Sequence, residues 1–151
     1  MSSEWPKYYE DFVEGDISEF GAYQVTREEV LEFASKYDPQ PFHLDDEAAK
    51  QSVFGRLAAS GWHTCSISMR LIVDQMTETG TKSLGGAGID ELRWRVPVYP
   101  GDTLKVRIKI GKKSPHPRKP LGFVHLHHEV VNQDEVVVMS YIAQVMIGNT
   151  P

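Results

Sequence analysis

The sequence has little cysteine and no long hydrophobic run, and both absences narrow what the chain can be. Its one cysteine, Cys65, excludes an internal disulfide framework. The longest uncharged stretch, residues 57–69, is broken by Gly61 and His63 and is shorter than the roughly 20 apolar residues of a membrane helix. The first residues also lack the basic head and apolar run of a secretory signal, so we expect a cytoplasmic protein that does not span a membrane.

What is present is typical of a globular protein with its own core. Hydrophobic residues make up 40% and charged residues 25% of the 151 positions. A chain of this length buries roughly 68–70% of the surface that it exposes when unfolded, so a structural metal is not needed for folding. Because no repeat, low-complexity tract or long linker divides the chain, we expect a single domain over residues 1–151.

Charge is unevenly distributed along the chain. Residues 1–51 hold 4 Lys or Arg against 13 Asp or Glu, whereas residues 82–119 hold 10 against 3. Two interpretations stay open: complementary halves or subunits face each other, or the basic part binds a phosphate-bearing ligand. The net charge of −5 and the absence of a nucleic-acid-binding motif argue against a nucleic-acid partner.

The first half of the chain has helical patterns. Thr26 and Glu29 have the spacing of a capping box, and the apolar residues that follow predict a helix over residues 27–37. Two prolines then disfavour helical dihedral angles at the residues before them, so residues 38–43 should form a stiff, extended turn. We expect a short helical turn over residues 46–51 to follow.

The middle of the chain predicts a long buried helix, and the rest predicts strands. Residues 61–76 place apolar side chains on every side of a helix, which indicates burial all round. Five strands are expected, over residues 17–25, 92–98, 104–110, 121–132 and 135–147. A Pro-Gly turn at residues 99–102 should join the second and third strands as an antiparallel hairpin. The expected fold is α+β, a five-stranded antiparallel sheet wrapped around the helix, with a second copy covering what stays exposed.

Asp38 and His43 are the strongest candidates for chemistry. A rigid turn that fixes a carboxylate and an imidazole at one place suits general acid and base catalysis on a water molecule. In the alternative interpretation, Asp38 caps a helix end and His43 packs on Leu44. Ser60 and Gly61 are the second candidate, because unpaired N–H groups at a helix start can bind an oxyanion and a glycine lets a ligand approach closely. Ser60 can equally be an ordinary N-cap.

Other motifs give weaker signals. His125 and His127 share one strand face, but a metal ion would need a third ligand, so we expect no metal site. Residues 85–88 are glycine-rich without the ending of a phosphate loop, which indicates a flexible turn or a close approach of the backbone to a ligand. Lys112 and Arg118 lie in an expected exposed hairpin loop. There they could bind the phosphates of coenzyme A across a dimer, or only keep the loop hydrated.

Three segments carry a resemblance that covers nearly the whole chain. They are Tyr-Asp-Pro-Gln-Pro-Phe-His at residues 37–43, Ala-Ser-Gly-Trp-His-Thr at residues 59–64 and Val-Tyr-Pro-Gly-Asp-Thr-Leu at residues 98–104. With them the chain resembles the MaoC-like dehydratase family, relatives of the (R)-specific enoyl-CoA hydratases. The resemblance implies a hot-dog fold, a homodimer or a larger oligomer built from dimers, and reversible addition of water to a trans-2-enoyl thioester without a cofactor.

The resemblance also implies roles for single residues. Asp38 and His43 match the catalytic pair that holds the water. Gly61 matches the backbone donor to the thioester carbonyl, and Ser66 matches a serine near the water network. The further residues that we expect to contact the substrate are Phe42, Ser60, Trp62, Gly86, Lys112 and Arg118. The leading hypothesis is therefore an acyl-CoA hydratase and dehydratase, with a thioesterase of the same fold and a non-catalytic acyl-CoA-binding subunit as alternatives.

Overall fold

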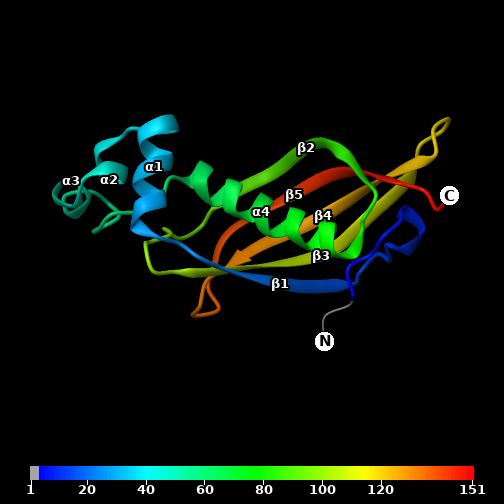
Figure 1. Cartoon of the computed structure of the whole chain (residues 1–151), viewed down its shortest axis with the longest axis horizontal. Helices are drawn as coiled ribbons and strands as arrows, with labels where there is room; N and C mark the ends of the chain where they lie inside the picture. The colour runs from blue at the N-terminus through cyan, green and yellow to red at the C-terminus, as the bar shows by residue number, and fades with distance from the viewer. Residues whose placement is uncertain (1–3) are drawn as a thin grey trace.

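A computed structural model describes residues 4–151, in which one sheet and one long helix dominate (Figure 1). The helices are the 3-10 helix η1 (Tyr9–Asp11), α1 (Arg27–Tyr37), α2 (Pro41–Leu44), α3 (Asp46–Lys50) and α4 (Gly61–Thr79). The strands are β1 (Ile17–Gln24), β2 (Ser83–Trp94), β3 (Thr103–Pro115), β4 (Leu121–Val131) and β5 (Val137–Gly148). All five strands pair antiparallel in the order β1-β3-β4-β5-β2, and α4 lies along one face of the sheet. This is the predicted α+β, hot-dog architecture.

Strand β3 shows how the alternating sequence builds the core. Its alternate residues Leu104, Val106, Ile108 and Ile110 are almost completely buried. They form one hydrophobic core with the inward side of α4. Burying side chains of this size stabilises the fold by about 1.5–3 kcal/mol each before entropy is counted. The period-two pattern therefore identified the buried face of this strand correctly.

The second predicted strand was wrong in extent and in partner. β2 includes residues 85–88, which are therefore in a strand and not in a flexible turn, whereas residues 95–98 lie outside any strand. β2 pairs with β5 and not with β3. The turn at residues 99–102 does form, with the N–H of Asp102 donating to the carbonyl of Tyr99. Alternation within a strand reports which face is buried, but the choice of partner depends on contacts between residues far apart in the sequence.

Residues 38–43 are more helical than predicted. α1 has the predicted bounds, but Pro41 occupies the first position of α2, and His43 lies inside that short helix. Proline is favoured at the first helical position, because it has no N–H to lose there and its fixed φ angle fits a helix. The two prolines thus end one helix and begin the next, instead of keeping the chain extended.

Helix α4 is longer than predicted and is only half buried in one copy of the chain. Trp62, Met69 and Val73 are 58%, 52% and 41% exposed, so the expectation of burial all round was wrong for a single chain. One sheet can cover only one side of a helix, and the apolar residues of the other side stay uncovered. Within residues 4–151, no helix is long and apolar enough to cross a membrane.

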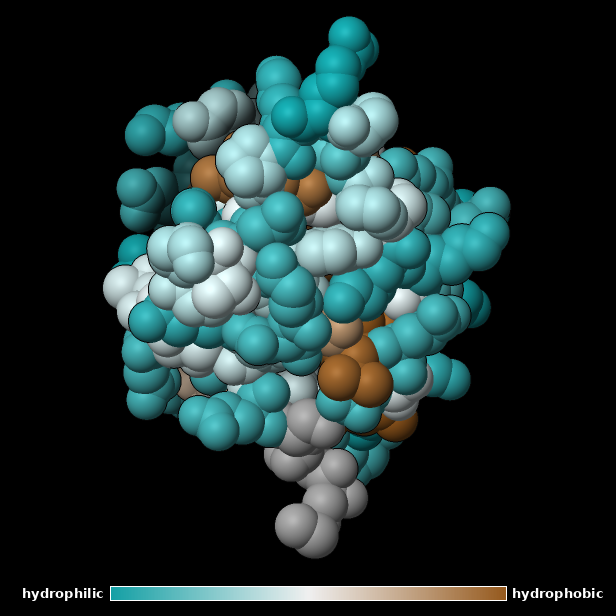
Figure 2. Space-filling view, turned by 90° about the vertical axis from the view of Figure 1, so that its right-hand side faces the viewer, coloured by the Kyte–Doolittle hydropathy of each residue, from teal (hydrophilic) through white to brown (hydrophobic). Residues whose placement is uncertain are grey.

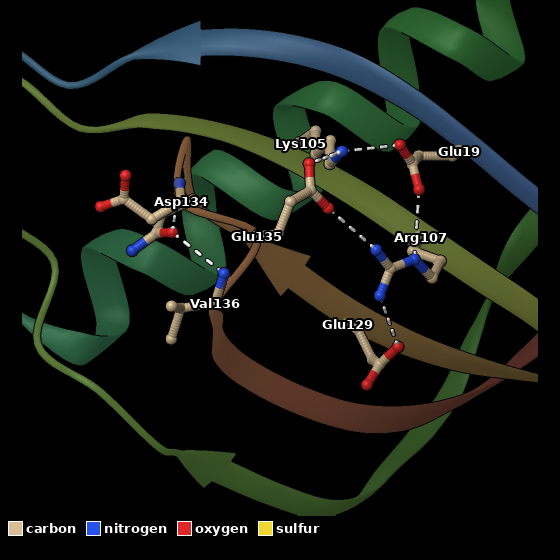
Figure 3. Close-up of polar contacts among 8 residues, drawn as sticks. Glu19, Lys105, Arg107, Glu129, Asp134, Glu135 and Val136 are labelled. Atoms are coloured by element: carbon tan, nitrogen blue, oxygen red, sulfur yellow. Dashed lines mark hydrogen bonds and ion pairs between the residues drawn. The ribbon is translucent and has the colours of Figure 1, made fainter.

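The acidic and basic halves of the chain meet on the face of the sheet opposite α4 (Figure 3). Lys105 lies 2.7 Å from a Glu19 carboxylate oxygen and 2.6 Å from one of Glu135. Arg107 lies 3.1 Å from Glu19 and 3.3 Å from Glu129. For these two cations the structure favours the interpretation that complementary halves face each other. We call these five residues the ion-pair network.

Candidate active site

The candidate site lies where α1, α2 and the start of α4 come together, at one end of the molecule (Figure 1). Asp38 follows the last residue of α1, and His43 is buried within α2. The two helices hold His43 Nε2 at 3.4 Å from Asp38 Oδ2. The structure therefore brings together the carboxylate and the imidazole that the sequence singled out.

Three hydrogen bonds fix the orientation of this pair. His43 Nδ1 lies 2.7 Å from the carbonyl oxygen of Ala58. A carbonyl oxygen can only accept, so Nδ1 carries a proton, and in the neutral ring Nε2 presents a lone pair towards Asp38. The hydroxyl of Ser60 donates to Asp38 Oδ2 at 2.7 Å, and Gln40 Nε2 donates to Asp38 Oδ1 at 2.6 Å.

The environment favours the charged form of Asp38. Burial raises the pKa of this carboxyl, but the hydrogen bonds from Gln40 and Ser60 and the nearby His43 outweigh it, so the pKa lies below its ordinary value. When the His43 ring is neutral, with its proton on Nδ1, its Nε2 and the Asp38 carboxylate are both acceptors, and neither supplies a donor to the other. A water molecule that reaches both can donate one hydrogen to each. This is an arrangement that can bind and activate water.

Ser60 connects the pair to the first turn of α4. Ser60 occupies the N-cap position of α4, as one interpretation predicted, but its hydroxyl is engaged with Asp38 and makes no capping bond to the helix. Gly61 follows directly, and the N–H groups of a first helical turn have no intrahelical partner. A single hydrogen bond thus ties the acidic residue to the end of the helix that can stabilise negative charge.

Three of the predicted substrate contacts lie near this site or along α4. Phe42 packs edge-on against His43, with ring centroids 4.6 Å apart. Trp62 and Gly86 line a largely apolar groove of about 830 Å³ between α4 and the strands β2 and β5. Cys65 lines the same groove, and burial raises the pKa of its thiol.

Other predicted residues are not brought to the pair within one chain. Ser66 is exposed, and its hydroxyl donates to the carbonyl of Trp62 at 3.0 Å. Lys112 lies in β3 and not in the predicted loop, while Arg118 lies in the turn between β3 and β4. That turn is at the end of the sheet opposite α1 to α3 (Figure 1), and the molecule viewed from there is mostly hydrophilic (Figure 2). Neither Lys112 nor Arg118 lines the groove that contains Trp62 and Gly86.

Sequence reasoning missed a second polar cluster between α1 and α4. Glu29, which closes the predicted capping box with Thr26, also accepts a hydrogen bond from the Tyr23 hydroxyl at 2.6 Å. This bond, with burial, raises the pKa of Tyr23 to about 12. His63 Nε2 lies 3.7 Å from Glu29, and burial lowers the pKa of His63 below its ordinary value. The capping box indicated Glu29, but no local spacing connects Glu29 to His63.

The histidines of β4 form no metal centre with their surroundings. Within residues 4–151, no three His, Cys, Asp or Glu side chains cluster as metal ligands. His128 is buried, with its ring stacked on Tyr141 at 4.3 Å between centroids. Burial lowers its pKa to about 4, so the ring is neutral near pH 7.

Comparison with known proteins points to one family. The family model described as a MaoC like domain matches residues 14–132. The uncharacterized protein YdeM of Bacillus subtilis (strain 168) is 29% identical over 138 residues, which are 91% of this chain and 96% of that protein.

Solved structures agree in fold over nearly the whole chain. The MaoC-like dehydratase from Rhodospirillum rubrum has a TM-score of 0.86 and 37% identity, covering 97% of this chain and 99% of that chain. The R-hydratase PhaJ1 from Pseudomonas aeruginosa, in its unliganded form, has a TM-score of 0.71 and 26% identity, covering 95% and 86%.

Proposed function

The chain belongs to the MaoC-like domain family, and from that premise we propose that it is an acyl-CoA hydratase and dehydratase. The reaction is the reversible addition of water to a trans-2-enoyl thioester, which gives a 3-hydroxyacyl thioester. One observation carries the proposal: the Asp38 carboxylate and the His43 imidazole face each other, with Oδ2 and Nε2 3.4 Å apart, and Ser60 at the start of α4 is hydrogen-bonded to the same carboxylate.

The proposed mechanism assigns each part of the reaction to a group at the site. Asp38 and His43 hold the water, take one of its protons as its oxygen attacks C3, and return a proton to C2. Negative charge builds on the thioester oxygen between these events. The N–H of Gly61 stabilises that oxygen, which could contribute about 3–4 kcal/mol, as single oxyanion-hole donors do. Ser60 and Gln40 orient the carboxylate through their hydrogen bonds.

Further side chains would bind the rest of the substrate. We assign the acyl chain to the groove beside Trp62 and Gly86, and we expect its reactive end to meet Phe42, which packs on His43. The phosphates of coenzyme A would meet Lys112 and Arg118 of a second copy, because these cations lie at the other end of their own chain. Ser66, close to Trp62 on α4, is proposed to approach the water network only when the substrate is bound.

Incubation with crotonyl-CoA tests the proposal directly. We expect loss of the enoyl absorbance without release of free thiol, which is the signature of hydration. Release of free thiol would instead identify a thioesterase. Tight binding without turnover over a panel of enoyl-CoA chain lengths would identify a binding subunit. Either of the last two results would overturn the proposed reaction.

We also propose that the active form is a homodimer or an oligomer built from dimers. β2 is an edge strand, and Met69 and Val73, which line the same groove as Trp62 and Gly86, expose apolar surface on the uncovered side of α4. Exposed apolar surface beside an unpaired edge is typical of a protein interface. Light scattering should give twice the mass of one chain or a multiple of that. Val73→Asp should shift the mass towards the monomer, whereas the control Val53→Asp, on a side chain 97% exposed, should not.

A further inference from the structure

The end of β2 has a backbone irregularity next to the candidate site. The pairing of β2 with β5 shifts register between Asp90 and Arg93, and Glu91 has a φ angle of 55°. Positive φ is uncommon for a residue other than glycine and persists where the surroundings fix it. A β-bulge bends the strand and redirects the side chains that follow. Here the side chain that follows is Trp94.

Trp94 is directed onto the first residue of α4. Its indole Nε1 donates a hydrogen bond to the carbonyl oxygen of Gly61 at 2.9 Å. Its ring packs edge-on against Trp62, with centroids 5.2 Å apart. A Cβ atom added to Gly61 would lie 2.6 Å from that indole nitrogen, closer than real Cβ atoms come to any neighbour. The indole ring therefore fills the space that a side chain at position 61 would need.

Gly61 is consequently held from two sides. On one side Ser60, the residue before it, is bonded to Asp38, and on the other side the indole bonds the carbonyl of Gly61. Glycine has the widest backbone freedom of any residue, and Gly61, as the first residue of α4, has no preceding helical turn to hold it. Fixing it beforehand orients its N–H at no further cost during the reaction.

We propose that Trp94 is the positioning residue for the Gly61 amide, and that Gly61 must be glycine because the indole of Trp94 occupies its side-chain space. This inference rests on the proposed function, since it assigns a task to the Gly61 amide. The sequence alone indicates a different reason for a glycine at position 61, namely that it lets a ligand approach the backbone closely. Trp94 acts through Gly61 and does not touch the reacting atoms.

A double-mutant cycle tests this inference, with kcat and KM for crotonyl-CoA and the melting temperature measured for every variant. We expect Gly61→Ala alone to lower kcat/KM about a hundredfold, because its methyl group clashes with the indole and the backbone that carries the Gly61 N–H has to shift. Trp94→Ala should lower kcat about tenfold and leave KM within about threefold. In the Trp94→Ala background, Gly61→Ala should cost less than about threefold, because the two residues act as one unit.

Two further variants separate the role of the indole N–H from that of the aromatic ring, and both from a general effect of changing β2. Trp94→Phe keeps an aromatic ring but loses the indole N–H, and it should lower kcat less than Trp94→Ala does. Leu84→Ala, at the other end of β2 on a side chain 47% exposed, should leave kcat within about twofold.

Several results would overturn the inference. If Gly61→Ala costs the same factor with and without Trp94, the glycine serves the ligand. If Trp94→Ala and Trp94→Phe lower only the melting temperature and leave kcat unchanged, Trp94 is merely structural. If the wild type hydrates no enoyl-CoA, the proposed function fails and the positioning role with it. The packing of Trp94 on Gly61 is then judged separately, from non-additive melting temperatures.

Discussion

The pair Asp38 and His43 and the ion-pair network are both clusters of ionisable groups. They differ in how many of their polar atoms already have a partner within the protein. In the network, Lys105 and Arg107 each contact two or more carboxylates on a solvent-facing side of the sheet. In the candidate site, a buried imidazole faces a half-buried carboxylate, and a neutral His43 with its proton on Nδ1 would leave two acceptors facing each other. The candidate site therefore differs from the ion-pair network in having polar atoms that can still bind a water molecule, and not in having more charge.

The comparison also bears on the charge pattern of the sequence, for which a phosphate-bearing ligand was one of two interpretations. Glu19, from the acidic part of the chain, takes up two of the cations of the basic part. Solvent screening makes such pairs worth about 0–1 kcal/mol each. They join β1 to β3 and engage both cations with carboxylates of their own chain.

The largest expected effect comes from removing one member of the candidate pair. Asp38→Asn and His43→Gln should each lower kcat for hydration at least about a hundredfold, because general acid and base catalysis contributes about 10²–10⁴. Steady-state kinetics with crotonyl-CoA measures this. The control Asp46→Asn removes an exposed carboxylate that pairs with Arg27 and should leave kcat unchanged. Full activity of either pair variant would remove the pair from the mechanism.

Two adjacent residues of β4 point to opposite faces of the sheet. Glu129 belongs to the ion-pair network, whereas His128 is buried in the core. Burial holds the pKa of His128 at about 4, although the contact with the Leu126 carbonyl works the other way. Between pH 6.5 and 4, His128 is therefore protonated in the unfolded chain but neutral in the folded chain. The free energy of unfolding should fall by about 3 kcal/mol over this range as pH falls.

His128→Phe isolates that contribution, because its ring can still stack on Tyr141. Denaturant unfolding at pH 7 and pH 4.5 should show a smaller loss of stability in the variant than in the wild type. An equal loss in both would show that His128 does not cause the dependence.

A smaller effect is expected from Ser60, whose hydrogen bond helps to hold the pKa of Asp38 below its ordinary value. Ser60→Ala removes that bond, so the pKa of Asp38 rises and the carboxylate becomes protonated at higher pH. Activity at pH 4.5 should fall about twofold relative to wild type and change much less at pH 8. Rate measurements from pH 4.5 to 9 check this. An unchanged acidic limb would contradict the assigned role of Ser60.

The smallest effect is expected in the ion-pair network. Arg107→Met should leave kcat unchanged and lower the free energy of unfolding by about 1 kcal/mol or less, a difference that shrinks in high salt. Thermal unfolding at low and high ionic strength measures it. A large loss of activity in this variant would break the distinction between the two clusters.

Local features of this chain were predictable and long-range ones were not. The capping box of Thr26 and Glu29, with the prolines that follow, gave the bounds of α1, because the relevant contacts lie within a few residues. The hydrogen bond between Ser60 and Asp38 and the packing of Trp94 on Gly61 join residues far apart in sequence. No periodicity encodes such contacts, just as none encodes the pairing of β2 with β5.

The central claim is that Asp38 and His43 activate one water molecule beside the amide of Gly61. A crystal structure with a bound 3-hydroxyacyl-CoA tests it most directly. We predict the 3-hydroxyl oxygen within about 3 Å of both side chains and the thioester oxygen accepting a hydrogen bond from the N–H of Gly61. A ligand whose hydroxyl contacts neither side chain, or whose thioester oxygen points away from α4, would contradict the claim.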